Sequence, residues 1–305
     1  MTLDALRHDA AAIQARRSFL DTARAYLSLT KPRIISLLLV TTVPTMIVAN
    51  GGIPTLTLIA LTLLGGTLAA AGANTINCYI DRDIDRVMIR TQGRPLAAGT
   101  IEPERALLFG LVLGAASFAI LAPFVNLLSA GLALGALAFY VFVYTIWLKR
   151  STVQNIVIGG AAGAMPPLVG WAAVTGSLGW PALLLFGIIF LWTPPHFWAL
   201  AMRYRNDYAR AGVPMLPVVR GEQETARQIV LYSVLLFAAS LLLIPVASMG
   251  LLYAVVSLAL GGWFIWLAVR LYRERTPASC LALFLYSLAY LALLYVAMGV
   301  DRLVA

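Results

Sequence analysis

Charge is scarce in this sequence of 305 residues. Asp, Glu, Lys and Arg make up 11% of it, whereas 61% of the residues are hydrophobic. A soluble globular domain carries roughly 25% charged residues. The composition therefore excludes a soluble domain and predicts an integral membrane protein. The length suits one polytopic bundle rather than several domains.

Two further absences narrow the fold and the chemistry. The apolar stretches are long and lack the strict alternation of a transmembrane strand, which disfavours a β-barrel. There are only two cysteines, Cys78 and Cys280, and they lie far apart on apolar segments. We therefore expect neither a disulfide nor a metal–thiolate site.

The apolar segments predict an all-α fold, a polytopic membrane helix bundle of about nine transmembrane helices. Each candidate span approaches the ~20 residues that a helix needs to cross a bilayer. The weakest boundary is the one at residues 248–250, between the seventh and eighth spans. The predicted spans are residues 34–50, 56–79, 106–122, 127–147, 155–175, 181–201, 229–247, 249–269 and 280–299.

The basic residues predict the orientation in the membrane. Every Lys and Arg except Arg302 lies before the first span or in alternate connections between spans. The positive-inside rule then places the N-terminus in the cytoplasm and the C-terminus outside. This topology and attraction to anionic lipid account for the net charge of +9, so we expect no nucleic-acid partner. Residues 1–30 predict an interfacial or cytoplasmic arm, and residues 31–305 a single transmembrane domain.

The densest group of charges lies in residues 74–96, NTINCYIDRDIDRVMIRTQGRPL. Asn77, Asp81 and Asp85 recur every fourth residue, a drift of only about 40° per step, so they share one helix face. Amide and carboxylate oxygens suit Mg²⁺ that is shared with a substrate phosphate. Asp83 lies off this face. The alternative is a solvated helix end whose arginines pair with its own carboxylates, at ~0.2–0.5 kcal/mol per pair.

Cations near this face favour a diphosphate as the ligand, because arginine forks and ammonium groups bind phosphate oxygens. An ordinary cytoplasmic loop remains the alternative for any one of them. The candidate diphosphate-binding residues are Lys31, Arg82, Arg90, Arg94, Lys149 and Arg150.

His196 is one of two histidines and follows two prolines inside an apolar span. An ionisable residue within a membrane span is a functional candidate by default. A hydrogen bond between helices is the alternative.

These motifs resemble those of a known family. The stretch at 74–96 looks like the first aspartate-rich motif of the UbiA-type intramembrane prenyltransferases. The resemblance covers about residues 26 to 300, and the particular residues of the motif are similar to those of the protohaem IX farnesyltransferase branch. Further matching segments are LTKPR (29–33), YTIWLKRST (144–152), NIVIGGAAGAMPPLVGW (155–171) and WTPPHFWALAMRYRNDYARAGVPMLPVV (192–219).

The resemblance implies a helix bundle around a central cavity in a bacterial inner membrane. It implies transfer of a farnesyl group from farnesyl diphosphate to the vinyl group of haem B, with addition of water, giving haem O for haem–copper oxidases. Haem B would be a substrate, and Mg²⁺ the cofactor. Association with haem A synthase or with oxidase assembly proteins is left open.

The resemblance also implies roles for residues. Asn77, Asp81 and Asp85 would act in catalysis as metal ligands, joined by Asp207 from the loop after the sixth span. Family members commonly have two aspartates in that loop, whereas this chain has one, which places a symmetric second metal site in doubt.

The haem-binding candidates under this resemblance are His196 and Arg203. Two alternatives remain at this point. One is a related transferase with another aromatic or tetrapyrrole acceptor, and the other is a transporter of haem or a lipid diphosphate. Charge gathered at one membrane face disfavours transport.

Overall fold

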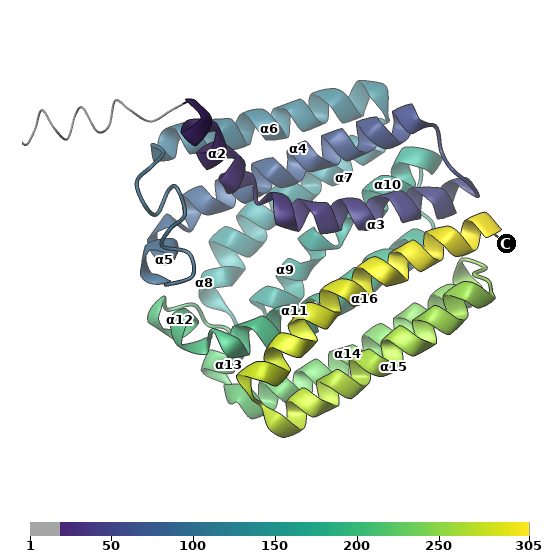
Figure 1. The fold of residues 1–305 in the computed structure, drawn as a ribbon. Helices are drawn as coiled ribbons and strands as arrows, with labels where there is room; N and C mark the ends of the chain where they lie inside the picture. Colours follow the sequence, from purple (N-terminus) through teal and green to yellow (C-terminus); the bar gives the residue numbers. More distant parts are fainter. Residues whose placement is uncertain (1–18, 305) are drawn as a thin grey trace, which may run out of the picture.

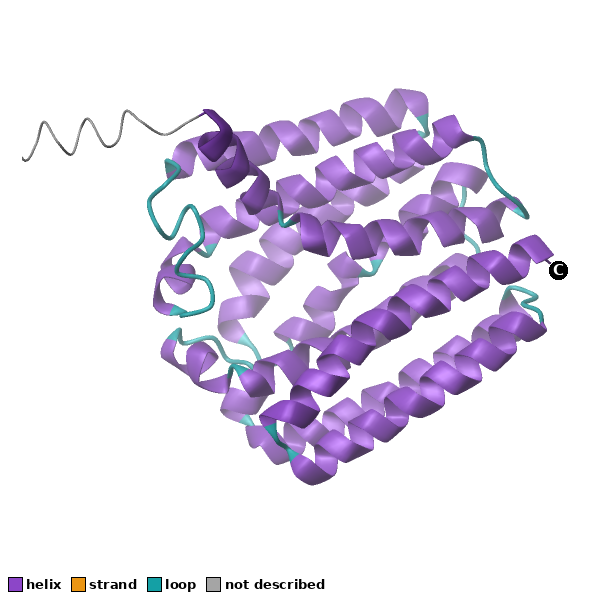
Figure 2. Cartoon of the chain, in the orientation of Figure 1, coloured by secondary structure: helices purple, strands orange, loops and turns teal. Residues whose placement is uncertain are grey.

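A computed structural model describes residues 19–304, and this part of the chain contains helices and loops but no strand (Figure 2). Within it, nine helices are long and apolar enough to cross a membrane. The predicted all-α membrane bundle is thereby confirmed. The first 18 residues of the predicted arm lie outside the described residues.

The helices follow one another with short connections. One segment, η1, is a π-helix, continuous with the helices on both sides of it. In chain order the elements are α2 (Phe19–Thr30), α3 (Pro32–Asn50), α4 (Leu56–Ile80), α5 (Arg82–Val87), α6 (Pro103–Phe124), α7 (Leu127–Ala138), η1 (Phe139–Leu148), α8 (Lys149–Ser151), α9 (Asn155–Gly163), α10 (Met165–Thr175), α11 (Trp180–Arg203), α12 (Arg205–Arg210), α13 (Leu216–Val219), α14 (Gly221–Val246), α15 (Leu251–Glu274) and α16 (Pro277–Val304).

Several helices extend beyond the predicted apolar segments. The seventh span begins at residue 221 instead of 229, and the eighth ends at residue 274 instead of 269. Apolarity marks only the part at hydrocarbon depth, whereas helical hydrogen bonding continues into the headgroup region. The predicted break between these two spans is confirmed, because α14 ends at Val246 and α15 begins at Leu251.

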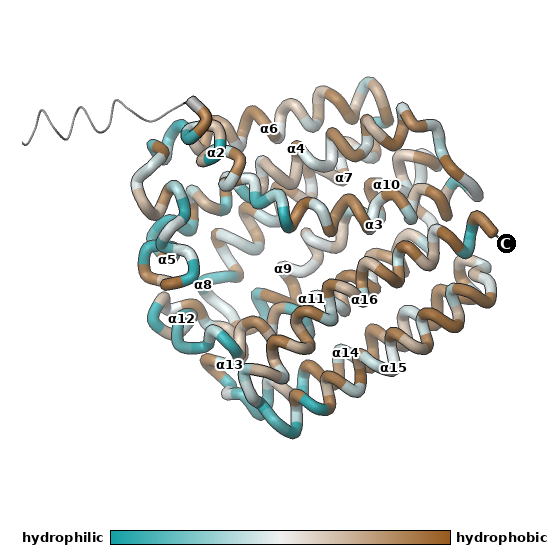
Figure 3. The backbone as a smooth tube through the Cα atoms, in the orientation of Figure 1, coloured by the Kyte–Doolittle hydropathy of each residue, from teal (hydrophilic) through white to brown (hydrophobic). Residues whose placement is uncertain are grey.

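The charged connections gather at one end of the bundle, which we call the charged end: α5, α8, α12, α13 and the loops beside them (Figure 1). Hydrophilic residues concentrate there, whereas the long helices are mostly hydrophobic (Figure 3). Helix α2 lies at this end and the C-terminus at the opposite one (Figure 1). An odd number of spans requires that separation.

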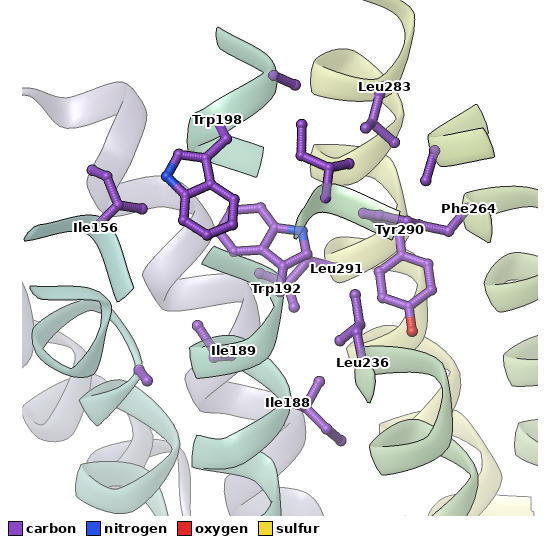
Figure 4. Close-up of a cluster of buried hydrophobic side chains, with 14 of the residues drawn as sticks. Ile156, Ile188, Ile189, Trp192, Trp198, Leu236, Phe264, Leu283, Tyr290 and Leu291 are labelled. Carbon is purple, nitrogen blue, oxygen red and sulfur yellow. The ribbon is translucent and has the colours of Figure 1, made fainter. Parts of the chain in front are cut away.

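The largest buried cluster joins α11, α14, α15 and α16 (Figure 4). It includes Trp192, Leu236, Phe264 and Leu291, each at most 5% exposed. Such helices associate in lipid through close packing rather than through exclusion of water. This cluster holds α11 and α16 together, and both helices contribute to the site.

The aspartate-rich segment folds as two helices rather than one. α4 ends at Ile80, and Asp81 adopts φ −85° and ψ 6° before α5 begins. Asn77, Asp81 and Asp85 are nevertheless all buried. The backbone N–H of Asp85 still donates to the Asp81 carbonyl at 2.8 Å. Asp81 and Asp85 therefore stay close, but their side chains meet different partners.

Candidate functional site

The centre of the site is a buried pair, Asn77 and Asp81, at the charged end of α4. Asp81 is 0% exposed, and its Oδ2 accepts a hydrogen bond of 2.7 Å from Asn77 Nδ2. Lys31 Nζ donates to Asn77 Oδ1 at 2.7 Å, and Lys149 pairs with Asp81 Oδ2. Two cations from distant segments thus meet one amide and one carboxylate.

The second carboxylate oxygen of Asp81, Oδ1, has no hydrogen-bond partner among the described residues. Oδ1 is buried, and Arg150 Nη2 lies 3.8 Å from it. A buried polar atom without a protein partner is costly, and such atoms are typical of strained, catalytic or ligand-binding positions. This oxygen is therefore available to a ligand.

Asp85 lies beside this pair with its own cation. It is 3% exposed, and Arg94 Nη1 lies 2.9 Å from both of its carboxylate oxygens. Thr91 Oγ1 donates to the Asp85 carbonyl at 3.2 Å, which ties the loop carrying Arg94 back to α5.

Asp83 points away from this group, as the spacing predicts. Its carboxylate accepts two hydrogen bonds of 2.7 Å from the Arg150 guanidinium and is 61% exposed. Those bonds lower the pKa of Asp83 from its usual 3.8 to about 2. Arg150, a diphosphate candidate, is thus engaged mainly outside the buried pair. Arg82, another candidate, lies over the Tyr79 ring at 4.6 Å.

The loop after the sixth span reaches the same end. Asp207 accepts a hydrogen bond of 3.4 Å from the backbone N–H of Arg90 and pairs with Arg210. Burial acts to raise the pKa of Asp207, but these hydrogen bonds outweigh it and lower the pKa. The Arg90 guanidinium lies over the Tyr204 ring, 5.6 Å from its centre. The two loops are joined by these contacts.

The local backbone conformation directs the side chains of Lys31 and Lys149 toward the site. Lys31 occupies the left-handed region at φ 56° between α2 and α3, and Pro32 then fixes the first turn of α3. A non-glycine residue in this conformation is uncommon. Its side chain is directed to Asn77, and burial lowers the pKa of Lys31.

Lys149 follows the π-helix η1. Hydrogen bonds in a π-helix join residues five apart and bring them onto one face, and such segments are frequent at functional sites. Thr145 Oγ1 donates to the Tyr140 carbonyl at 2.8 Å and accepts from Asn77 Nδ2 at 3.1 Å. The Tyr140 and Tyr144 rings stack with their centres 5.2 Å apart.

The haem-binding candidates occupy a separate part of α11. His196 is 7% exposed, and its Nδ1 lies 2.7 Å from Ser287 Oγ on α16. Its ring stacks on Trp192 and on Phe284, with centres 4.3 and 4.6 Å apart. Arg203, at the end of α11, donates to the Pro277 carbonyl at 3.3 Å.

Three residues of these contacts escaped the sequence interpretation: Thr145, Phe284 and Ser287. Each is an ordinary residue of an apolar helix, and although Thr145 lies in the matching segment YTIWLKRST, no spacing or charge pattern gave any of the three a role. Only the packing of helices brings Thr145 to Asn77, and Phe284 and Ser287 to His196.

The donor set can be tested for Mg²⁺. In residues 19–304, no three His, Cys, Asp or Glu side chains form a ready metal cluster. Mg²⁺ does not require one, because it keeps several waters and is typically held by one or two carboxylates and substrate phosphates. The unpaired Asp81 Oδ1, with Asp85 and Asn77 beside it, fits that mode of binding.

Comparison with known proteins identifies the family. The model of the UbiA prenyltransferase family matches residues 38–294. The chain belongs to the UbiA prenyltransferase family. It is a multi-pass membrane enzyme of the prenyltransferase class.

Relatives of this prenyltransferase share more than half of its residues. A Clavibacter sepedonicus protein named protoheme IX farnesyltransferase is 55% identical over 300 residues, covering 96% of this chain and 98% of that protein. A Gloeobacter violaceus protein of the same name is 57% identical over 279 residues, covering 91% and 92%.

Solved structures share the fold of this prenyltransferase. A UbiA homolog from Archaeoglobus fulgidus bound to DMAPP and Mg²⁺ has a TM-score of 0.68 at 20% identity, covering 92% of this chain and 99% of that one. A structure of digeranylgeranylglyceryl phosphate synthase has a TM-score of 0.76 at 19% identity, covering 93% and 99%. At these identities the similarity describes the fold alone.

Proposed function

We propose that this prenyltransferase joins farnesyl diphosphate and haem B and adds water, releasing haem O and diphosphate. The allylic C–O bond breaks, and its electron pair leaves with the diphosphate. A C–C bond then forms between the farnesyl carbon and the vinyl group. Water captures the resulting cation and gives up a proton.

The observation that carries this proposal is the buried Asp81 with one unpaired oxygen, in a group of side chains that cations from separate segments contact. A diphosphate ligand with bound metal matches this combination of charges, because its oxygens suit the cations and the metal suits the carboxylate. The choice of haem B as acceptor and farnesyl as donor rests on the name of relatives that are about 55% identical over nearly the whole chain.

Asn77, Asp81 and Asp85 would hold Mg²⁺, with Asp207 added from the second loop. Bound Mg²⁺ supplies positive charge that stabilises the leaving diphosphate. The protein contributes cations of its own: Lys149 and Arg94 pair with the two carboxylates, and Lys31 donates to the Asn77 amide. When a diphosphate enters, these cations can bind its oxygens, with Arg82, Arg90 and Arg150 at the margin. Charge stabilisation where charge develops is often the largest contribution to catalysis.

The farnesyl cation must avoid water until it meets the vinyl group. The stacked rings of Tyr140 and Tyr144 lie on η1, the helix that leads to Lys149, and aromatic faces attract cations. Tyr79, beside Arg82, lies at the same end. His196 would contact haem B, and Arg203 at the charged end would pair with a propionate.

The bacterial inner membrane is the proposed location, with the charged end in the cytoplasm and the C-terminus outside. The clustering of hydrophilic residues at one end of the bundle supports this orientation (Figure 3). Residues 1–30 would form a cytoplasmic or interfacial arm before the transmembrane domain of residues 31–305. Association with haem A synthase or oxidase assembly proteins would occur in the same membrane.

The test is to incubate the purified protein with haem B and farnesyl diphosphate and to detect haem O by mass spectrometry. We expect product with Mg²⁺ and none with EDTA. Asp81→Asn should lower the rate by on the order of 10²-fold or more. Asp83→Asn is the matched control, because its carboxylate lies outside the buried group, and it should remain active.

A product formed from a hydroxybenzoate but not from haem B would refute the choice of acceptor. Full activity of Asp81→Asn would refute the metal–diphosphate site. Haem O formed equally well in EDTA would refute the role of Mg²⁺.

A further inference from the structure

The His196 ring stacks on two aromatic rings. Trp192, one turn earlier on α11, stacks on it with an interplanar angle of 17°, and Phe284 of α16 stacks on it at 25°. Phe197 meets it edge-on, with ring centres 5.1 Å apart. These contacts fix the plane of the imidazole. The hydrogen bond at the edge of the ring determines which nitrogen carries the proton.

That hydrogen bond involves Ser287, which is fully buried. Ser287 Oγ lies 2.6 Å from the Phe284 carbonyl oxygen and 2.7 Å from His196 Nδ1. A hydroxyl has one hydrogen, and a carbonyl oxygen can only accept. The hydroxyl therefore donates to Phe284 and accepts from His196.

The proton of the neutral imidazole is thus on Nδ1, and Nε2 keeps a free lone pair. Ser287 holds the neighbouring ring as well, because its carbonyl oxygen accepts a hydrogen bond of 2.8 Å from Trp192 Nε1. One residue of α16 thereby fixes both stacked rings of α11. Trp192 belongs to the large buried cluster, which resists displacement of that ring (Figure 4).

We propose that Ser287 is a positioning residue that holds His196 as the Nδ1–H tautomer, so that Nε2 binds the iron of the acceptor haem. This inference rests on haem B being the acceptor in the proposed function. Iron takes a neutral imidazole nitrogen, and the hydrogen bond at the opposite nitrogen orients the ring and increases its basicity. Ser287 would influence haem without touching it.

A purely structural role is the alternative, in which the His196–Ser287 bond only joins α11 to α16. The two roles differ in what a spectrum reports. Loss of an iron ligand changes the Soret band and the spin state of ferric haem, whereas loss of a helix contact lowers stability and leaves the spectrum of bound haem unchanged.

The experiment titrates the purified full chain in detergent with ferric haem B, without farnesyl diphosphate. It records the Soret band, the electron paramagnetic resonance spectrum and the dissociation constant. The variants are His196→Ala, Ser287→Ala and Ser287→Thr. Ser240→Ala is the matched control, since Ser240 is also a buried serine that bonds a ring residue of α16, Tyr290, at 2.8 Å.

We expect an imidazole-ligated spectrum for the wild type. His196→Ala should lose it, and added imidazole should restore it. Ser287→Ala should raise the dissociation constant about 10-fold or more, the size typical of losing a partner of a metal-bound histidine. Ser287→Thr keeps the hydroxyl and should stay near the wild type, as should Ser240→Ala.

An unchanged haem spectrum in His196→Ala would overturn the proposal, and so would equal affinity of Ser287→Ala and Ser240→Ala. Haem O production by the wild type separates this inference from the proposed function. If haem O forms but these spectra do not change, only this inference fails. If the wild type neither binds haem B nor forms haem O, the proposed acceptor fails with it.

Discussion

Replacing Lys149 by methionine would leave Asp81 buried without its closest counter-charge. Asp81 is 0% exposed, and the Lys149 side chain is 16% exposed. Two unit charges about 3 Å apart attract by roughly 5 kcal/mol at an effective dielectric constant of about 20. Removing one member of a buried ion pair costs about 3–5 kcal/mol, because the other charge stays buried and unpaired. We expect a loss near the lower value, since Lys149 retains some access to solvent.

Removing the carboxylate as well should reverse part of this loss. In Asp81→Asn the amide can still accept from Asn77, so this variant should cost only about 1–2 kcal/mol. The double variant should then be more stable than Lys149→Met alone by about 2 kcal/mol, although it stays inactive. The coupling free energy of this cycle measures the ion pair itself.

The assay is equilibrium unfolding of the purified protein in mixed detergent micelles, with wild type, both single variants and the double variant measured together. Free energies that add to within about 0.5 kcal/mol would rule out a coupled ion pair, because independent sites behave in that way. A stable Lys149→Met variant would mean that Asp81 is solvated or protonated in the native protein.

Three further predictions concern other parts of the molecule. Gly159→Ala places a Cβ 2.2 Å from the Tyr144 ring, so it should destabilise the protein by about 1–3 kcal/mol and lower turnover. In the control Gly163→Ala, on the same helix, the Cβ meets nothing within 4 Å, so stability and turnover should not fall. Equal effects of the two variants would contradict this packing. Asp301→Ala leaves two backbone N–H groups at the start of α15, at the end opposite the site, without their acceptor. In unfolding assays it should lower stability by about 1–2 kcal/mol, while kcat of the folded enzyme stays unchanged. A lower kcat would contradict the separation of Asp301 from the site. Thr145→Val should lower kcat/KM for farnesyl diphosphate on the order of 10-fold and Thr145→Ser should retain it, whereas equal kinetics would remove the hydroxyl from the site.

The aspartate-rich stretch illustrates what local spacing can predict. The recurrence of Asn77, Asp81 and Asp85 at every fourth residue anticipated their proximity, and it placed Asp83 apart from them. It did not anticipate the break of the helix at Asp81, because φ −85° and ψ 6° end α4 while the hydrogen bond from the Asp85 N–H to the Asp81 carbonyl preserves the spacing. Nor did it anticipate that Asp85 pairs with Arg94 rather than with the lysines.

Composition and the order of residues were sufficient for the class of the protein, the number of its spans and the clustering of its charge, because burial in hydrocarbon depends on composition over about 20 consecutive residues. Which partners meet depends on the tertiary structure. Lys149 and Arg150 are adjacent, yet Lys149 contacts the buried Asp81 and Arg150 mainly the exposed Asp83. The bond between His196 and Ser287 joins residues 91 positions apart. Such pairs depend on how helices pack and on the direction in which each side chain leaves its helix, and no local pattern encodes either.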